Sequence, residues 1–406
     1  MGLAGLMPAP PAPDGAPRIL VLNAGSSSLK AALVVLPDVT AGRAEVSWGA
    51  DASRHRDRAS GLASALRELG LAAADLTPAE LTAVGYRVVH GGARFSAPSL
   101  IDDEVVAGIR AVAELAPLHN GMALETIEAG RALLPDVPHV ACFDTAFHAT
   151  LPPEAYRYPV PERWFRDWGV RRFGFHGLSV AWAVRRSAQL LGRDAADLAL
   201  VVAHLGSGCS VTAVDGGRAV ETSMGLTPLE GLMMGTRSGS IDPGVPLHLM
   251  SRGLASADEL AEDLDHHAGL LGVSGTSSDL RELEAASAAG DERATLAISM
   301  FVRRAAAWIA SVATSLPRLD GLVFTGGIGE HAAAVRARIV ERLSVLGLPP
   351  LPASGPDRGD DGRLDDATGP TAVLRVAARE DLIIAAECIA VLRPHRAPAP
   401  DLPAKA

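Results

Sequence analysis

Three short loops rich in glycine and serine, each following an apolar run, could bind phosphate groups. They are the segments 23–28, 204–210 and 325–330. Small side chains let the backbone N–H groups of such a loop approach an anion closely. One such loop alone is more often an ordinary tight turn, but three in one chain favour a nucleotide. None has the Walker A pattern, and the glycines of the third loop lack the dinucleotide-binding spacing.

Two arginines and two histidines lie where a substrate could approach them. Arg87 lies on an expected strand that leads into the segment His90-Gly91-Gly92. His176 and Arg237 have glycine neighbours, and His119 follows an expected helix. Glycine neighbours remove side-chain bulk around the charged groups. Each of these residues alone is more often a surface charge or a satisfied core group. Together they would suit an anionic substrate.

Two carboxylates stand at the ends of expected elements. Asp144 follows the apolar run His139–Phe143, and Glu380 begins the expected helix Glu380–Leu392. An acidic side chain at the end of a strand is a common Mg²⁺ ligand. Glu380 has a strong second interpretation, because an acid in the first turn also complements the helix dipole. Zinc is disfavoured, since the adjacent His266 and His267 cannot share one helix face.

The elements that would position these groups alternate between strand and helix from Arg18 onwards, which predicts an α/β fold. The runs 19–22 and 29–36 flank the first loop, and the runs 200–203 and 211–214 flank the second. Each pair predicts a β-hairpin with N–H groups at its tip. Two such hairpins suggest an internal duplication, with two α/β lobes and a cleft between them. Two unrelated turns in one large α/β protein explain the pattern equally well.

Two helices can be read from their ends and faces. Asp102 is the expected N-cap of a helix that Pro117 ends. Met300, Trp308 and Val312 mark a long helix before Pro317.

Composition excludes several classes of protein. The chain has 406 residues and a formal net charge of −10, with no basic stripe, so neither nucleic acid nor an anionic membrane is an expected partner. No stretch reaches the roughly 20 uninterrupted apolar residues of a membrane span. Three cysteines without a CxxC pair indicate reduced thiols and a cytoplasmic protein. Residues 1–17, rich in Pro and Ala, are an expected disordered extension.

Longer motifs carry a family resemblance. The run Val21-Leu22-Asn23-Ala24-Gly25-Ser26-Ser27-Ser28-Leu29-Lys30 resembles the opening signature of the acetate kinase family. The segments 221–231 and 234–243 resemble its second signature, and the segments 87–92, 143–148 and 175–177 also fit. The resemblance runs in order from about Arg18 to Leu392, which makes it far more specific than any single glycine loop.

The resemblance implies a fold of two duplicated RNase H-like domains of the actin-like ATPase superfamily, with an interdomain active-site cleft. It places domain I at residues 18–147 plus 381–396 and the nucleotide-binding domain II at 148–380. It also implies a homodimer that transfers the γ-phosphoryl group of ATP directly to acetate, reversibly, giving acetyl phosphate and ADP. Mg²⁺ would be the metal, with Mn²⁺ as a substitute.

The resemblance also implies a role for each matching residue. Arg87, His119, Asp144, His176 and Arg237 would be catalytic. The acid would contact Arg87, Val89, Leu118, Phe175 and Pro228, and the metal would contact Asn23 and Glu380. The nucleotide would lie against a larger set: Lys30, His204, Leu205, Gly206, Ser207, Gly208, Asp279, Leu280, Arg281, Gly327, Ile328 and Gly329.

The sequence departs from the family pattern at a few positions. Ser207 stands where the family usually has Asn and reaches less far. Leu178 and Val180 replace the usual Thr and His. His331 and Arg379 each replace an Asn, and Arg379 places beside Glu380 a cation that would weaken a metal contact there.

The chemistry explains this choice of residues. A carboxylic acid titrates near pH ~4, so the nucleophile is already ionised and needs no general base. The reaction instead requires positive charge around the phosphoryl group in flight. A propionate or other short-chain acyl kinase is the nearest alternative, because one methylene changes binding by only about 1–3 kcal/mol. A sugar or glycerol kinase and a non-kinase actin-like ATPase are the alternatives from other classes.

Overall fold

The structure is a computed structural model that describes residues 15–25, 28–47, 55–71, 80–351, 361–366 and 369–393. The side chains of residues 55–57, 117 and 118 also lie outside this description. Most of the expected N-terminal extension, residues 394–396 of the expected domain I, Ser26 and Ser27 of the first loop, and the Leu118 side chain therefore fall outside the described part.

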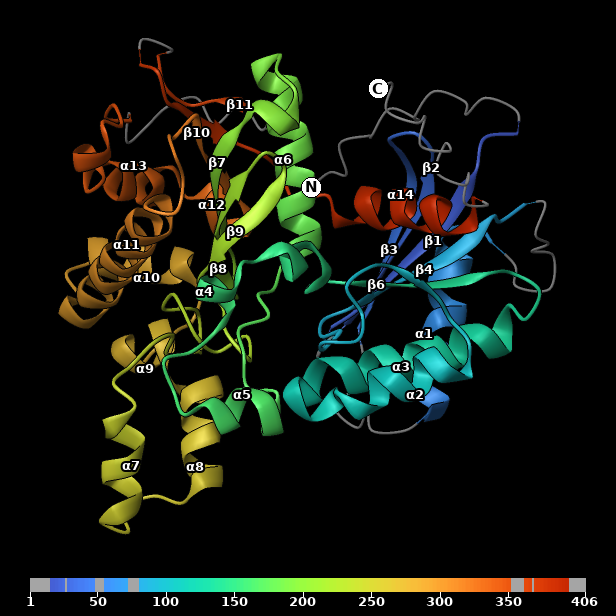
Figure 1. The fold of residues 1–406 in the computed structure, drawn as a ribbon, viewed down its shortest axis with the longest axis horizontal. Coiled ribbons are helices and arrows are strands. Elements are labelled where there is room, and N and C mark those ends of the chain that lie inside the picture. The colour runs from blue at the N-terminus through green and yellow to red at the C-terminus, as the bar shows by residue number, and fades with distance from the viewer. Residues whose placement is uncertain are drawn as a thin grey trace, which may run out of the picture.

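One six-stranded sheet is built from the N-terminal third of the chain, in the order β3-β2-β1-β4-β6-β5 (Figure 1). Strands β1, β2 and β3 form an antiparallel meander, β4 and β6 continue it in parallel with β1, and β5 pairs antiparallel with β6. The strands are β1 Arg18–Ala24, β2 Ser28–Val35, β3 Val39–Ser47, β4 Ala83–Val88, β5 Ser99–Leu100 and β6 His139–Phe143.

A second six-stranded sheet has the order β11-β12-β10-β7-β8-β9. Here β7, β8 and β9 form the antiparallel meander, β10 and β12 run parallel to β7, and β11 pairs antiparallel with β12. The strands are β7 Ala199–Leu205, β8 Cys209–Asp215, β9 Arg218–Thr222, β10 Gly321–Thr325, β11 Gly362–Arg363 and β12 Ala372–Arg375. The two sheets thus repeat one order and direction, and the expected α/β fold of two similar domains is confirmed.

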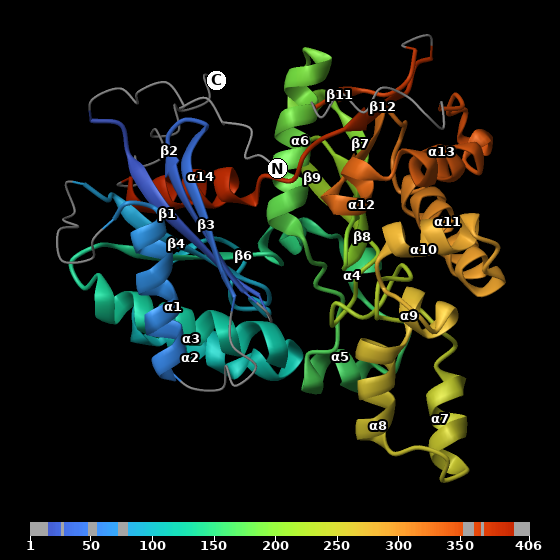
Figure 2. The same cartoon turned by 180° about the vertical axis from the view of Figure 1, so that it is seen from behind.

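Helices cover both sheets (Figures 1 and 2). Those before the second sheet are α1 His55–Glu68, α2 Asp103–Ala111, α3 Pro117–Leu133, α4 Pro153–Tyr156, α5 Glu162–Trp168 and α6 Gly177–Leu191. The others are α7 Gly244–Ser251, α8 Ala257–Glu262, α9 Gly269–Ser274, α10 Leu280–Ala288, α11 Glu292–Ala313, α12 Gly326–His331, α13 Ala333–Glu341 and α14 Glu380–Leu392. Short 3-10 turns are Ala113–Leu115, Ala146–Thr150, Ala195–Asp197 and Ser344–Leu346, and Asp263–His267 is a π-helical turn.

Alternate residues of each strand enter different cores, as a pleated strand requires. Leu20 and Leu22 pack with the helices α1, α2 and α3. Ile19 and Val21 face the other side, where α14 and α6 pack between the two sheets. Helix α14 follows the second sheet in sequence yet contacts β1, β4 and β6 of the first. This crossing brings Glu380, at the start of α14, to the first lobe.

Helix α11 is the one helix in the described ranges that is long and apolar enough to cross a membrane. Its buried residues, among them Ile298, Phe301, Val302 and Ile309, belong to the core of the second lobe. Its apolar composition is therefore explained by core packing.

The expected helix ends are confirmed at Asp102 and wrong at Pro117. Asp102 accepts a hydrogen bond from the backbone N–H of Val105 at 2.8 Å and caps α2. That helix ends at Ala111, and Pro117 begins α3. A proline lacks the N–H that the first helical position leaves unpaired, so it suits a helix start as well as a helix end.

The contact between α14 and β4 leaves no room for a side chain at Gly85. A Cβ atom there would lie 2.5 Å from Ile384 Cγ2 and 2.7 Å from Cys388 Sγ. We expect Gly85→Ala to lower the free energy of unfolding by about 1–3 kcal/mol, because overpacking forces the helix off the sheet. Urea unfolding measures this. Gly121→Ala, which meets no atom within 4 Å in α3, is the control and should be neutral or stabilising. Equal stability of the two variants would contradict the packing.

Candidate active site

A cleft of about 1400 Å³ lies between the two lobes. Its walls come from β1, β2 and β3 and the start of α14 on one side, and from the second and third glycine loops and α10 on the other. Of the residues expected to act there, those that line it are Asn23, Lys30, Arg87, His176, His204, Gly206, Ser207, Gly208, Asp279, Leu280, Arg281, Gly327, Ile328 and Glu380. Residues expected from the sequence therefore line both walls of the cleft.

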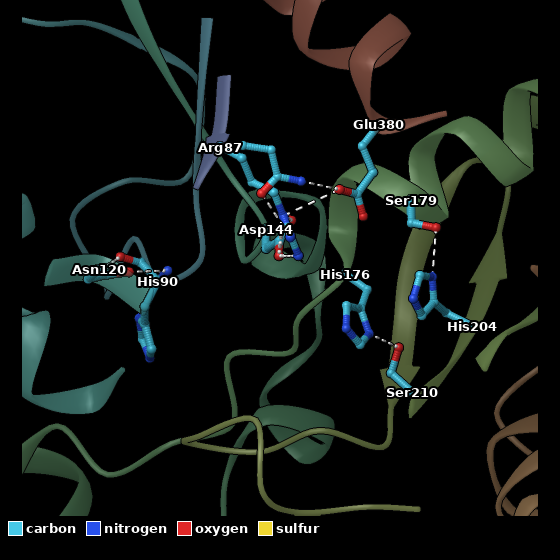
Figure 3. Close-up of polar contacts among 10 residues, drawn as sticks. Arg87, His90, Asn120, Asp144, His176, Ser179, His204, Ser210 and Glu380 are labelled. Atoms are coloured by element: carbon cyan, nitrogen blue, oxygen red, sulfur yellow. Dashed lines mark hydrogen bonds and ion pairs between the residues drawn. The ribbon is translucent and has the colours of Figure 1, made fainter. Parts of the chain in front are cut away.

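A buried ion pair stands at the end of the first sheet. Both side-chain oxygens of Asp144 accept hydrogen bonds from Arg87, with the shortest contact 2.6 Å from Nη2 to Oδ2 (Figure 3). Asp144 is 1% exposed and Arg87 19%. Glu380 Oε2 lies 3.4 Å from Arg87 Nε and accepts from Asn23 Nδ2 at 3.4 Å. The four side chains thus come from three strand ends and the start of α14.

Burial and charge change the pKa values of this pair. Burial acts to lower the pKa of Arg87, but the charges of Asp144 and Glu380 more than offset it and raise that pKa. Burial raises the pKa of Asp144, with the neighbouring Glu380 adding to the effect and Arg87 opposing it. Arg87 therefore remains a cation at the cleft, and Asp144 acts on it from behind.

Two stacked imidazoles form the floor between the lobes. The rings of His176 and His204 lie 4.1 Å apart at 21°. Each is fixed by a serine: His176 Nδ1 is 2.9 Å from Ser210 Oγ, and His204 Nδ1 is 2.8 Å from Ser179 Oγ (Figure 3). His176 holds a left-handed backbone conformation with φ 59°, which turns it out of the start of α6.

Arg237 reaches this floor from the second lobe. Its Nη1 donates to the carbonyl oxygen of Pro228 at 2.7 Å. A Cβ atom on Gly208 would lie 3.3 Å from Arg237 Nη2 and 3.4 Å from His176 Nε2. Both groups therefore lie beside this glycine.

The imidazoles near these arginines are neutral. Burial, aided by the charges of Arg237 and Arg87, lowers the pKa of His119 to about 4. Burial and Arg87 lower the pKa of His204 to about 4. The pKa of His176 falls well below its ordinary value, through burial and then through His204 and the two arginines. Neutral rings donate hydrogen bonds without adding charge.

Two of the residues expected to bind the acid, Val89 and Phe175, are buried. Val89 and Phe175 belong to one buried cluster with Ala116, beside the start of α3. His90 sets its ring edge against Phe175 and places Nε2 3.1 Å from the carbonyl oxygen of Leu226 in the other lobe. Asn120 holds the backbone of His90 through two hydrogen bonds.

Several expected positions do not line the cleft: Val89, His119, Asp144, Phe175, Leu205, Pro228, Arg237 and Gly329. Leu205 is fully buried behind the cleft wall, and the carbonyl oxygen of Gly329 accepts from Arg336. Arg281 is 88% exposed at the side chain and pairs with Asp279, which lowers the pKa of Asp279 to about 2. Both residues of this pair still line the cleft.

The departures from the family pattern have structural outcomes. Leu178 and Val180 are buried in the core between the sheets. Arg379 turns away from Glu380: its Nε donates to Asp381 at 3.0 Å, and its Nη2 donates to Thr40 at 2.5 Å. Arg379 thus pairs with Asp381, and its effect on a metal contact of Glu380 stays a prediction.

Sequence reasoning missed Ser210 and Ser179, which orient the two imidazoles. Ser210 was within a recognised loop, but Ser179 had no visible signal because its partner is 25 residues away in the chain. It also missed Glu330, whose Oε1 accepts from the backbone N–H of Ala378 at 2.9 Å and so holds the segment before Glu380.

The side chains at the cleft can be compared with those that bind a divalent cation. In the described ranges, no group of three or more His, Cys, Asp or Glu side chains could hold a metal. Glu380 and Asn23 nevertheless place a carboxylate and an amide at the cleft. Asn23 donates from Nδ2 to Glu380 Oε2, and its Oδ1 accepts from Arg87 Nη1 at 3.4 Å. Mg²⁺ typically takes one or two protein oxygens and completes its shell with substrate phosphates and water. Two such ligands are too few to hold the ion alone, so the pair would bind Mg²⁺ only together with a nucleotide.

Fold and site together define a two-lobed α/β protein whose cleft is lined by arginines, imidazoles and glycine loops. Comparison with known proteins identifies the family within this class. The chain matches the acetokinase family over residues 18–386, and it belongs to that family.

Known acetate kinases are similar to this chain over nearly its whole length. An acetate kinase from Deinococcus radiodurans is 45% identical, with 92% of this chain and 98% of the relative covered. One from Deinococcus deserti is 48% identical, covering 92% and 97%. Among solved structures, a Porphyromonas gingivalis acetate kinase has a TM-score of 0.82 at 34% identity, covering 93% and 100%. A Francisella tularensis propionate kinase has 0.82 at 36% identity, covering 91% and 98%.

The buried neutral histidines make stability depend on pH, and His148 isolates the effect. Its Nε2 lies 3.0 Å from Thr212 Oγ1, and burial lowers its pKa from 6.5 to about 4. Below pH 6.5 the unfolded chain binds a proton that the folded protein does not, until the pH reaches about 4. We therefore expect the stability advantage of the natural protein over His148→Gln to shrink as pH falls across this window. Urea unfolding at pH 7, 6 and 5 measures the gap; a constant gap would contradict it.

Proposed function

We propose that this protein transfers the γ-phosphoryl group of ATP to acetate, giving acetyl phosphate and ADP. The observation that carries the proposal is that Arg87 and His176 line the inter-lobe cleft and that Arg237 lies beside His176 at Gly208, in a chain of the acetokinase family. The reaction joins two anions, and fixed cations reduce their repulsion. A pair of unit charges 4 Å apart is worth about 4 kcal/mol at an effective dielectric of 20.

In this mechanism the protein positions charge and moves no proton to or from the acid, which is already ionised. Arg87, held from behind by Asp144, and Arg237, held by Pro228, bind the carboxylate and the phosphoryl oxygens. If Ser210 donates to His176 Nδ1, the ring keeps its proton on Nε2, facing Gly208. The neutral ring then donates a hydrogen bond to an equatorial phosphoryl oxygen. His119 supports this arrangement beside both arginines.

The nucleotide phosphates would lie along the glycine loops at 206–208 and 327–329, with the nucleoside against Asp279 and Arg281. Lys30, 65% exposed, would approach the phosphates from β2. Glu380 and Asn23 would hold Mg²⁺, or Mn²⁺ in its place. The ion would supply further positive charge to the phosphate oxygens.

We also propose a cytoplasmic homodimer with domains at 18–147 plus 381–396 and at 148–380. Three buried, unpaired cysteines suit a reducing compartment. Exposed apolar side chains on and around α7 favour a second copy as partner: Ile241, Val245, Leu247, Met250 and Leu254. The crossing of α6 and α14 between the sheets supports the domain division.

A short-chain acyl kinase with another preferred acid is the second candidate, because a propionate kinase is among the similar structures. An ATP-dependent hydroxamate assay with acetate, propionate, butyrate and glycerol separates the candidates. We expect the largest kcat/KM with acetate and no product with glycerol. A larger kcat/KM with propionate than with acetate would show that propionate is the preferred acid. If the protein hydrolyses ATP and no acid increases the rate, it is a non-kinase ATPase.

Removing either arginine tests the catalytic assignment. We expect Arg237→Ala and Arg87→Ala to lower kcat by at least ~10²–10³, the usual loss for one such donor. Arg237→Lys should also be impaired, because lysine lacks the planar fork. Arg110→Ala is the control, since Arg110 is exposed and pairs only with Glu128 in the described part of the chain. Circular dichroism must show that the variants fold, because Arg87→Ala leaves Asp144 buried without its cation. Near-normal turnover in a folded variant would contradict the assignment.

A further inference from the structure

A half-buried polar network holds the segment that carries Pro228, the hydrogen-bond partner of Arg237. It consists of Tyr158, Arg172 and Glu230, and we call it the Tyr158–Glu230–Arg172 network. Tyr158 follows α4, which packs against β9, and Arg172 follows α5. Glu230 lies in the segment 222–231 that leaves β9 and carries Pro228. None of the three side chains lines the cleft.

Arg172 holds the start of this segment. Its Nη1 donates to the carbonyl oxygens of Thr222 and Ser223, each at 3.0 Å, and of Met224 at 3.2 Å. Its Nη2 donates to Glu230 Oε1 at 3.0 Å, near the end of the same segment. One guanidinium, 13% exposed, thus joins both ends of the loop.

Tyr158 holds the middle and the end of the segment 222–231. Its hydroxyl donates to Glu230 Oε2 and accepts from the backbone N–H of Leu226 at 3.0 Å. Burial and the charge of Glu230 raise the pKa of Tyr158, so the hydroxyl keeps the proton that it donates. A Cβ atom on Gly225 would meet Glu230 Oε2 and the Tyr158 hydroxyl, so the glycine lets both groups lie close to the segment.

The segment held in this way contacts the proposed reaction centre at two points. The carbonyl oxygen of Leu226 lies 3.1 Å from His90 Nε2 of the first lobe. The carbonyl oxygen of Pro228 accepts from Arg237 Nη1 at 2.7 Å. Because Pro228 has no N–H and little conformational freedom, the position of its carbonyl follows that of the residues on either side.

We propose that the Tyr158–Glu230–Arg172 network positions Arg237 and sets how tightly the protein binds its carboxylic acid. The inference rests on the proposed function, in which Arg237 binds the acid. Tyr158, Arg172 and Glu230 are positioning residues that act through the Pro228 carbonyl. Loosening the segment would let the guanidinium of Arg237 leave its place against Gly208 and His176, while the nucleotide loops keep their own supports.

The kinetic test uses Tyr158→Phe, which removes one hydroxyl and keeps the ring. We expect KM for acetate to rise about 5- to 50-fold, with KM for ATP changed less than 2-fold. Tyr156→Phe is the matched control: Tyr156 lies two residues away, and its hydroxyl shows no hydrogen bond in the described ranges. It should keep both KM values within 2-fold. An equal rise of both KM values in Tyr158→Phe would overturn the proposal, because that is the effect of general destabilisation.

A double-mutant cycle tests whether the effect passes through Arg237. In an Arg237→Ala background, Tyr158→Phe should change kcat/KM for acetate less than 2-fold. The same fold-loss in both backgrounds would overturn the proposal. Glu230→Gln, which keeps the volume and removes the charge, should repeat the KM split of Tyr158→Phe.

A crystal structure of Tyr158→Phe provides a readout that needs no activity. We expect the contact between Arg237 Nη1 and the Pro228 carbonyl oxygen to be lost. An unchanged contact would overturn the network as a positioning device whatever the kinetics. If the natural protein shows no acid-dependent formation of ADP, the proposed function fails, and this structural measurement still decides the network.

Discussion

The ion pair of Arg87 and Asp144 is the contact on which the rest of the site depends. Two neighbouring parallel strands, β4 and β6, end at the same edge of the first sheet and bring the two side chains together. A buried carboxylate without its cation is costly, and a buried pair is stable only with good geometry and further polar partners. Glu380 and Asn23 supply those partners. The pair therefore holds a guanidinium at the cleft and links the first sheet to α14.

The same burial that holds the arginines keeps the imidazoles neutral. His176 and His204 stack on each other. The charge of Arg87 acts on both rings and that of Arg237 on His176, so a charged ring would face both desolvation and like charge. The site thus offers permanent positive charge from arginine and hydrogen bonds from neutral histidine. This division of roles suits transfer between two anions, where charge must be ready before the substrates meet.

The crossing of helices between the lobes explains how distant segments share one cleft. Helix α14 begins beside the second sheet and packs on the first, and α6 begins directly after His176 and packs between both. A movement of one lobe against the other would therefore change the distance between Glu380 and the glycine loops. Arg379, Asp381 and Thr40 join the start of α14 to β3, which keeps Glu380 with the first lobe.

The sequence by itself determined the family, the α/β class and the strand-and-loop units that carry most of the site, because these depend on local patterns and contiguous motifs. The limits of β6 and α14, and with them Asp144 and Glu380, followed directly from apolar runs. Only the tertiary structure decided which groups meet. Ser179 reaches His204 across 25 positions, and Arg172 reaches Glu230 across 58. Pairings over such separations depend on how the elements pack, and no local pattern records them.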